Sequence, residues 1–332
     1  MNKYTKAGLS ALAGSLVAVS AAQADWTVSG AGKMSYTQKG GKTDSKNDGG
    51  RFGMDRSITI GSSMEMDNGW AVSSSYTIDV ASESNSSLTV DMGAMGAIAY
   101  NMVDGALGIS KIDDTLPSAD EETWNGFAAG IANGRVKHST ATGFNYSNTV
   151  SDMVTVNIGL VPQGSSNRST GAVGQTGAGT DETHNSQASI ALTMTPMDGL
   201  TVYAGTGEGG AAATDAGTGK NDDLQVLAAT YAYGPVSVGY SDTEIDSDTT
   251  SRQYDTTGMS IAYAINDNLS ISYAERTVDR GSSATDEEQS GFSIGYSMGG
   301  MTIKAHSNAI DSSNGVSGTD HEHTEIAVSF AF

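Results

Sequence analysis

The chain of 332 residues contains no cysteine, only four prolines and few basic residues. Without cysteine it has no disulfide, no thiolate nucleophile and no zinc–thiolate site. The scarcity of proline permits long strands, because proline cannot donate to the hydrogen-bond ladder of a sheet. Lysine and arginine together number 17 against 38 acidic residues, so the net charge is −21. Such a balance, with no basic cluster, argues against nucleic acid as a partner.

Long apolar runs are also missing beyond the N-terminus. Nothing there reaches the roughly 20 residues of a helical membrane span, and the mean hydropathy is negative. These features are typical of a water-soluble protein, but they do not exclude a transmembrane β-barrel. In such a barrel lipid-facing and lumen-facing residues alternate, so the average hydropathy is close to neutral.

The N-terminus has the three parts of a secretory signal peptide. Lys3 and Lys6 form a positive region, Ala7 to Val19 are small and apolar, and Ala22-Gln23-Ala24 fits the small-residue cleavage pattern. We expect residues 1–24 to be cleaved, so that residues 25–332 form one exported domain. The alternative is an uncleaved membrane anchor, for which the apolar run is short.

After this segment apolar and polar residues alternate with a period of two, the pattern of strands with one apolar face. In the first strand Val28, Met34 and Tyr36 share one face, while Lys33 lies on the other. Counting such segments gives sixteen strands of about ten residues, enough to cross a membrane when tilted. Short turns alternate with longer polar loops. The short turns are predicted at Asp67–Gly69, Gly93–Met95, near Asp152, and at Pro196–Gly199, Gly234-Pro235, Asn266–Asn268 and Gly299-Gly300.

This pattern predicts an all-β fold, a transmembrane antiparallel barrel of sixteen strands with short periplasmic turns and long external loops. A sheet in hydrocarbon can have no free edge, so the last strand should pair with the first. Aromatic residues such as Trp70, Tyr240 and Phe330 fall on apolar faces near strand ends, as in the aromatic girdles of barrels. A soluble β-sandwich would alternate in the same way, but bulky aliphatic residues are too few for a dry core of this size.

One stretch breaks the alternation. Residues 103–134 lack strand periodicity and contain Lys111 as their only base. Loops of this length without regular structure are usually functional or disordered, and the apolar residues Leu107, Ile109, Leu116, Trp124 and Phe127 argue against disorder. We therefore expect this segment to fold into the lumen and narrow it. Its acidic residues are Asp104, Asp113, Asp114, Asp120, Glu121 and Glu122.

Four features resemble the Gram-negative general porins, especially the alphaproteobacterial type. They are the Ala22-Gln23-Ala24 signal end, the first strand at Trp26–Gly30, the Arg51-Phe52-Gly53-Met54 stretch and an alternating last strand ending in Phe332. The resemblance implies a homotrimer of sixteen-stranded outer-membrane barrels whose third external loop folds inward. It also implies that Phe332 is read by the barrel-assembly machinery. By count, residues 103–134 are that third loop, although they lack the Pro-Glu-Phe type of motif found in some enterobacterial porins.

The function expected of such a barrel is a water-filled diffusion channel for ions and small hydrophilic solutes, with selectivity set by diameter and lining charges. We expect the acidic residues of the loop to stand opposite a basic wall and to create a transverse field. The negative excess predicts a weak cation preference. Alternate residues of a strand face opposite sides, and this parity predicts which basic residues face the lumen. They are Lys33, Arg135, Lys137, Arg276 and Lys304.

Other candidate sites are weaker. His321-Glu322-His323 places two imidazoles on one strand face, but without a third ligand we predict no metal site. Gly217 to Lys220 resemble a phosphate-binding loop but precede no helix, and there is no nucleophile elbow, so we expect neither a cofactor nor an enzyme. The acidic loops 242–248 and 279–288 either bridge divalent cations to lipopolysaccharide or are simply solvated. The alternative functions are a substrate-specific outer-membrane channel and a secreted or surface adhesive β-protein.

Overall fold

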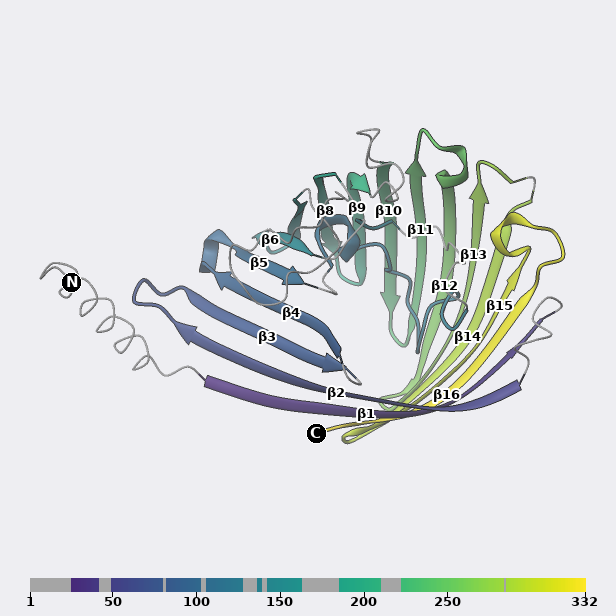
Figure 1. Cartoon of the computed structure of the whole chain (residues 1–332), viewed down its shortest axis with the longest axis horizontal. Helices are drawn as coiled ribbons and strands as arrows, with labels where there is room; N and C mark the ends of the chain where they lie inside the picture. Colours follow the sequence, from purple (N-terminus) through teal and green to yellow (C-terminus); the bar gives the residue numbers. More distant parts are fainter. Residues whose placement is uncertain are drawn as a thin grey trace, which may run out of the picture.

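The structure is a computed structural model that describes residues 25–41, 49–79, 82–102, 106–127, 136–138, 142–162, 185–209, 222–283 and 285–332. In these ranges sixteen antiparallel strands close into a barrel, each paired with its neighbours in sequence, and the last pairs with the first (Figure 1). The expected fold class and strand number are confirmed. The predicted signal peptide, residues 1–24, lies outside the described residues.

The strands are β1 (Asp25–Gly40), β2 (Gly49–Glu65), β3 (Ala71–Asp79), β4 (Ser82–Asp91), β5 (Ala97–Met102), β6 (Gly143–Ser151), β7 (Val154–Val161), β8 (Gln187–Met197), β9 (Leu200–Gly209), β10 (Asp222–Tyr233), β11 (Val236–Asp246), β12 (Tyr254–Asn266), β13 (Leu269–Arg280), β14 (Glu287–Met298), β15 (Met301–Asp311) and β16 (His321–Ala331). Short 3-10 turns lie at η1 (Gly93–Met95), η2 (Gly108–Lys111), η3 (Thr250–Arg252) and η4 (Ser313–Gly315). Within the described residues no helix has the length and apolar character needed to cross a membrane.

Closure depends on the chain end. The backbone nitrogen of Gly30 donates to the carbonyl oxygen of Phe332 at 3.1 Å, and the nitrogen of Phe332 donates to the oxygen of Gly30 at 2.8 Å. From there β16 runs antiparallel to β1, from Ala31 opposite Ala331 to Gly40 opposite Glu322. The predicted pairing of the first and last strands is therefore confirmed, and no strand edge is left at this seam.

The two faces of the wall differ as the alternation predicts. Trp26, Val28 and Met34 point outward, with 71%, 73% and 59% of their surfaces exposed. Lys33 lies between these residues in sequence and reaches inward to Glu325, with 2.7 Å between its Nζ and the carboxylate oxygen. The apolar outer face is the surface that would meet lipid.

The strands extend beyond the predicted apolar segments. The polar run Thr37–Asp55 shows little alternation in the sequence, yet β1 continues to Gly40 and β2 begins at Gly49. Similarly, β13 reaches Arg280 and β15 reaches Asp311. Beyond the apolar band both faces of a strand meet water, so the alternation ends while backbone pairing continues. Hydropathy therefore marks the lipid-facing part of a strand rather than its full length.

One strand prediction was wrong. In the sequence Val136, Phe144 and Tyr146 resume the alternation after residues 103–134, which predicts a sixth strand from Val136. The strand instead starts at Gly143. The described residues 136–138 have no strand conformation, and Val136 is fully buried against apolar residues of the loop and the inner wall. Packing inside the barrel, rather than a lipid-facing position, accounts for this valine.

Candidate pore constriction

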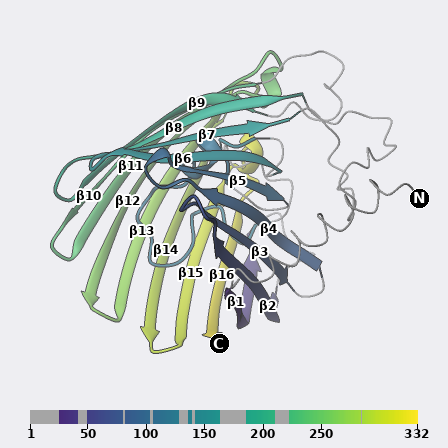
Figure 2. The ribbon, with the colours of Figure 1, turned by 90° about the vertical axis from the view of Figure 1, so that its left-hand side faces the viewer.

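The described part of the long acidic segment, residues 106–127 and here called the inner loop, follows the inside of the wall from β6 to β16. The Gly108 nitrogen donates to Asn145 Oδ1 on β6 at 2.9 Å, and the Ala119 nitrogen donates to Ser272 Oγ on β13 at 2.8 Å. Further along, Asn308 Nδ2 of β15 donates to the Glu122 carbonyl oxygen at 2.8 Å. Figures 1 and 2 show this segment in blue across the concave side of the strands. The predicted inward fold of the loop is confirmed.

The first half of the inner loop is held by an apolar anchor of Ile109, Ile112 and Val136 packed on the inner wall. Its wall partners are Ala191 on β8 and Leu224 and Val226 on β10. Burying an isoleucine side chain contributes roughly 1.5–3 kcal/mol, so the anchor outweighs any single hydrogen bond of the loop. The inner wall is therefore not uniformly polar, and its apolar patch lies where the loop needs a partner.

The backbone of the loop approaches this wall closely at Gly108, which has a positive φ of 49°. A Cβ atom at Gly108 would lie 2.1 Å from Ser189 Oγ and 2.6 Å from the Gly159 nitrogen. Glycine is required there both for the left-handed conformation and for space. The neighbouring Ile109 nitrogen donates to the same Ser189 hydroxyl at 3.0 Å, which fixes the register of loop and wall.

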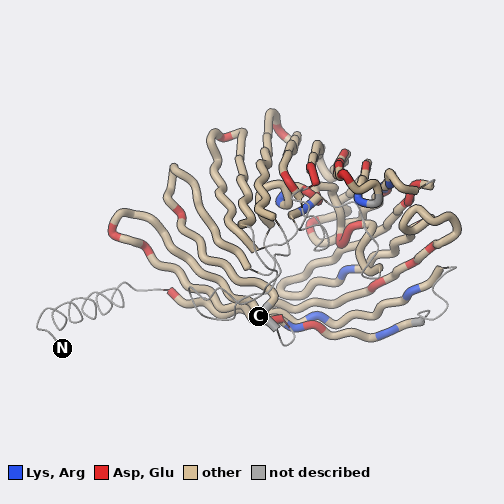
Figure 3. The backbone as a smooth tube through the Cα atoms, turned by 45° about the horizontal axis from the view of Figure 1, so that its top comes forward, with Lys and Arg blue, Asp and Glu red and all other residues tan. Residues whose placement is uncertain are grey.

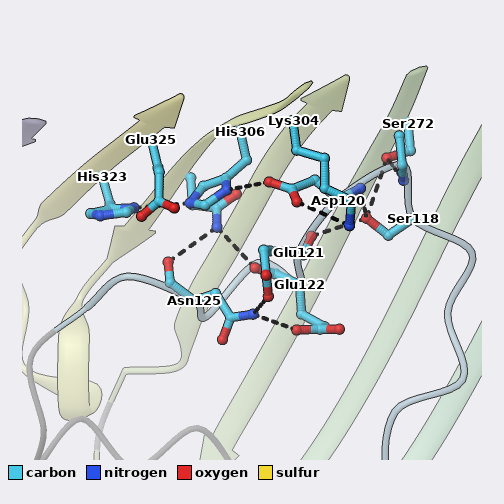
Figure 4. Close-up of polar contacts among 12 residues, drawn as sticks. Ser118, Asp120, Glu121, Glu122, Asn125, Ser272, Lys304, His306, His323 and Glu325 are labelled. Atoms are coloured by element: carbon cyan, nitrogen blue, oxygen red, sulfur yellow. Dashed lines mark hydrogen bonds and ion pairs between the residues drawn. The ribbon is translucent and has the colours of Figure 1, made fainter. Parts of the chain in front are cut away.

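The second half of the inner loop is held by polar contacts, which Figure 4 shows. Asp120 accepts a hydrogen bond from His306 Nδ1 at 2.7 Å and lies 3.3 Å from Lys304 Nζ. The other ring nitrogen of His306 is 3.0 Å from His323 Nδ1, and the two rings stack with centroids 5.1 Å apart. Thr123 Oγ1 donates to Gln289 Oε1 at 2.9 Å. These bonds fix the tip of the loop against β14, β15 and β16.

The environment of Asp120 favours its charged form. Burial alone would raise the pKa of this carboxyl, but the hydrogen bond from His306 and the positive charge of Lys304 outweigh burial, so the pKa is lowered. Because the pKa is lowered, these contacts stabilise the docked loop fully at every pH above the pKa of an ordinary aspartate. The stabilisation is lost only as pH falls through the lowered value.

Glu121 has the opposite environment, and it shares a hydrogen-bond donor with the neighbouring Glu122. Both carboxylates accept hydrogen bonds from the single side-chain amide of Asn125, and in the described part of the chain neither forms an ion pair. Burial raises the pKa of Glu121, and the negative charges of Asp120 and Glu122 raise it further. We call Glu121 and Glu122 the glutamate pair. Lys304 and Lys33 offset the charge of Glu121 only in part, so the pair places net negative charge on the inner loop.

This raised pKa predicts a pH dependence. As the solution is acidified, Glu121 should take up a proton at a higher pH than an ordinary glutamate, and the cation preference of the pore should fall over the same range. Reversal potentials recorded in a salt gradient across a pH series would measure the effect. The Glu121→Gln variant should lose this part of the pH response. A cation preference in the wild type that changes only at the pH of an ordinary carboxylate would contradict the assignment.

The predicted basic residues do not stand opposite the acids as expected. Lys304 contacts Asp120 directly, and Lys33 contacts Glu325 of the neighbouring strand. Arg276 does face inward, but it is only 5% exposed and its guanidinium lies 4.4 Å from the centre of the Trp124 ring. The loop docks on the wall that carries these bases, so acids and bases meet on one side of the lumen. In Figure 3 the charged residues likewise gather on one side of the barrel, and strands β5–β8 carry none.

The remaining predicted site residues lie on or near the loop. Asp113 is partly buried and Asp114 is exposed, both just after η2. Lys137 is exposed but not on a strand, so the alternation of faces along a strand does not apply to it. Asp104 and Arg135 lie outside the described residues.

Sequence reasoning missed His306, His323 and Asn125 as partners of the loop. Parity could have found the two histidines, since His306 shares its face with Lys304 and His323 shares its face with Glu325. Parity could not have shown that the loop reaches them. His323 had been weighed only as part of a metal pair. Among the described residues no group of three or more metal-ligating side chains comes together.

Comparisons with known proteins agree on one family and one fold. The sequence model of a family described as Gram-negative porin matches residues 8–332. Among solved structures, a triple mutant of Rhodopseudomonas blastica porin is 14% identical, with a TM-score of 0.63 over 93% of this chain and 100% of that chain. Salmonella typhi OmpF in complex with daunomycin is 11% identical, with a TM-score of 0.66 over 92% of this chain and 97% of that chain. A search of curated proteins found no significant match.

Proposed function

This chain belongs to the Gram-negative porin family, and from that premise we propose that its channel is weakly cation-selective and passes ions and small hydrophilic solutes. The family and the closed barrel make it a diffusion channel of the outer membrane. A barrel of sixteen strands leaves a water-filled lumen. Permeation through it is set by the width of the lumen and by the charges along its walls.

The observation that carries the proposed selectivity is the glutamate pair. Asp120 is largely offset by Lys304, whereas Glu121 and Glu122 share one amide and form no ion pair among the described residues. Charges at a water-filled constriction between protein walls act more strongly than charges on an open surface. Cations are therefore concentrated, and anions depleted, beside the second half of the loop. Asp104, Asp113 and Asp114 would add to this field, while Arg135 and Lys137 would oppose it.

Substituting both members of the pair, Glu121→Gln with Glu122→Gln, should lower the cation preference of the pore. The change removes two charges and keeps the size of both side chains, so the loop stays docked and the channel stays open. The measurement is the reversal potential of single channels in a planar bilayer under a salt gradient.

The matched control is Glu288→Gln with Asp311→Asn. These two acids lie opposite each other on β14 and β15 and are exposed on the outer face. The control removes the same charge from outside the lumen and should leave the reversal potential unchanged. An equal shift in both double variants would show that total charge, not the loop, sets selectivity.

Export and assembly complete the proposal. Residues 1–24 would be removed on export, and the exposed aromatic ring of Phe332 at the closing seam would be the mark read by the barrel-assembly machinery. Three barrels would associate in the membrane, in contact with lipid and lipopolysaccharide. N-terminal sequencing and chemical cross-linking of the outer-membrane protein test these points. An N-terminus other than Asp25 or a monomer in cross-linking would refute the corresponding point.

A further inference from the structure

Between the inner loop and the wall of β3–β6 lies a recess that none of the roles above uses. Its volume is about 650 Å³, and eight of its ten lining residues are polar. This volume is within the roughly 300–1,000 Å³ of small-molecule sites. We propose that this recess binds small hydrophilic anions that bear an oxyanion group, such as a phosphate or a carboxylate, together with hydroxyl groups. The proposal rests on the proposed channel function, because a solute reaches the recess through the lumen.

The wall of the recess offers an ordered row of hydrogen-bonding groups. Ser75 on β3 is directly opposite Ser87 on β4, which is directly opposite Asn101 on β5. Neighbouring strands are about 4.8 Å apart, so the row suits a solute with several oxygen atoms. Among the described residues no protein group hydrogen-bonds the side chains of Ser75, Ser87, Asn101 or the adjacent Thr89. Their hydrogen-bonding capacity is thus available to water or to a solute.

Lys111 supplies the only charge of the recess. It is the last residue of η2, which is held by the buried side chains of Leu107 and Ile109 and by the hydrogen bond from Gly108 to Asn145. In the described part of the chain Lys111 takes part in no ion pair. A firmly held backbone segment therefore carries an ammonium group without an ion-pair partner, and only the exposed lysine side chain has to become ordered on binding.

The composition of the recess selects among ligand classes. None of its lining residues is acidic, which disfavours cations, and none is aromatic, so a sugar ring has no face to stack on. Of the four wall strands, β5 and β6 contain no charged residue, and the acids of β3 and β4 whose side chains the structure describes, Asp79 and Asp91, are not among the lining residues. Within the lining, Lys111 is therefore offset by no acid. An ammonium group with hydroxyl and amide donors around it matches an oxyanion with attached hydroxyls better than a neutral polyol.

Occlusion of single channels by glucose 6-phosphate, with glucose as the uncharged probe, tests the recess. Glucose 6-phosphate should reduce the ion current of the wild-type channel at lower concentration than glucose. Lys111→Gln should weaken this block about tenfold, the effect of losing a charge-assisted hydrogen bond of about 1.4 kcal/mol. Ser87→Val, which fills the recess without changing charge, should also weaken it. The matched control is Lys39→Gln, which removes a lysine of the inner wall away from the recess. Glucose 6-phosphate should block this variant at the same concentration as the wild type.

The outcomes separate the two proposals. Channels that conduct but show equal block in wild-type and Lys111→Gln proteins would overturn the recess and leave the channel function intact. Equal block by glucose and glucose 6-phosphate would show that the recess binds polyols and would overturn the proposed anion site. Isothermal titration of the purified protein with glucose 6-phosphate measures binding without conduction. Binding to the wild type that is lost in Lys111→Gln would support the recess even if the selectivity proposal fails. Absence of binding heat together with absence of block would refute it.

Discussion

Replacing Ile109 with aspartate should release the first half of the inner loop and give a larger, noisier single-channel current. Ile109 is fully buried in the apolar anchor with Ile112, Val136 and the wall residues of β8 and β10. An unpaired carboxylate buried there would cost several kcal/mol. The hydrogen bonds that Gly108 and Ile109 make to the wall contribute about 1 kcal/mol each and cannot hold the segment in place. The loop would then leave the wall, and the constriction would widen and fluctuate.

The matched variant is Ile109→Val, which removes one methylene group, costs about 1 kcal/mol and should keep a steady current. Folding of both barrels is checked by the shift in gel mobility on heating, because the sixteen-strand ladder does not include Ile109. A steady wild-type current from a folded Ile109→Asp barrel would contradict the view that the anchor holds the constriction.

The second large effect is expected at a buried ion pair near the end of β13. The carboxylate of Glu287 is fully buried and lies 2.9 Å from Arg280 Nη2. It also accepts hydrogen bonds from Gln289 Nε2 at 2.7 Å and from the Asn314 nitrogen in η4 at 2.7 Å. Arg280→Met would leave this carboxylate buried without its counter-charge. Removing one partner of such a pair typically costs about 3–5 kcal/mol, and the unfolding midpoint in denaturant should fall accordingly.

Replacing both partners supplies the comparison for that result. Arg280→Met with Glu287→Leu removes the charge as well as its partner, and apolar replacements of buried pairs are often neutral or stabilising. The double variant should therefore recover most of the lost stability, although the bond to Asn314 is absent. If the single and double variants unfold at the same midpoint, the loss at Arg280 would reflect packing rather than an unpaired charge.

The barrel could be predicted from the sequence because lipid and water select opposite faces of each strand. Val28 and Met34 mark the outer face of β1, Lys33 marks the inner face, and the same parity recurs to Phe332. The ends of the strands were harder to predict, because beyond the lipid both faces are polar and only backbone pairing continues, as between Thr37 and Gly40. Val136 was misassigned because an apolar residue that packs inside the lumen has the same local appearance as one that faces lipid.

The site was predictable only in part, for a related reason. Parity placed Lys33, Arg276 and Lys304 on the inner wall, since they lie on strands with a fixed period. The path of the inner loop has no period and depends on distant partners such as Ser189, Ser272 and His306. Composition could therefore show that the loop was acidic and apolar, but not that Asp120 would contact Lys304 while the glutamate pair formed no ion pair. The recess beside Lys111 likewise forms only when the loop and the uncharged strands come together.

The measurement that tests the central claim most directly is the reversal potential of the wild-type channel in a planar bilayer separating two concentrations of potassium chloride at neutral pH. The glutamate pair on a docked inner loop predicts stepwise channels whose reversal potential has the sign of a cation-preferring pore, with a size well below that of a pore permeable to cations alone. A reversal potential of zero, or one of the opposite sign, would contradict the assignment of the inner loop as the element that sets selectivity.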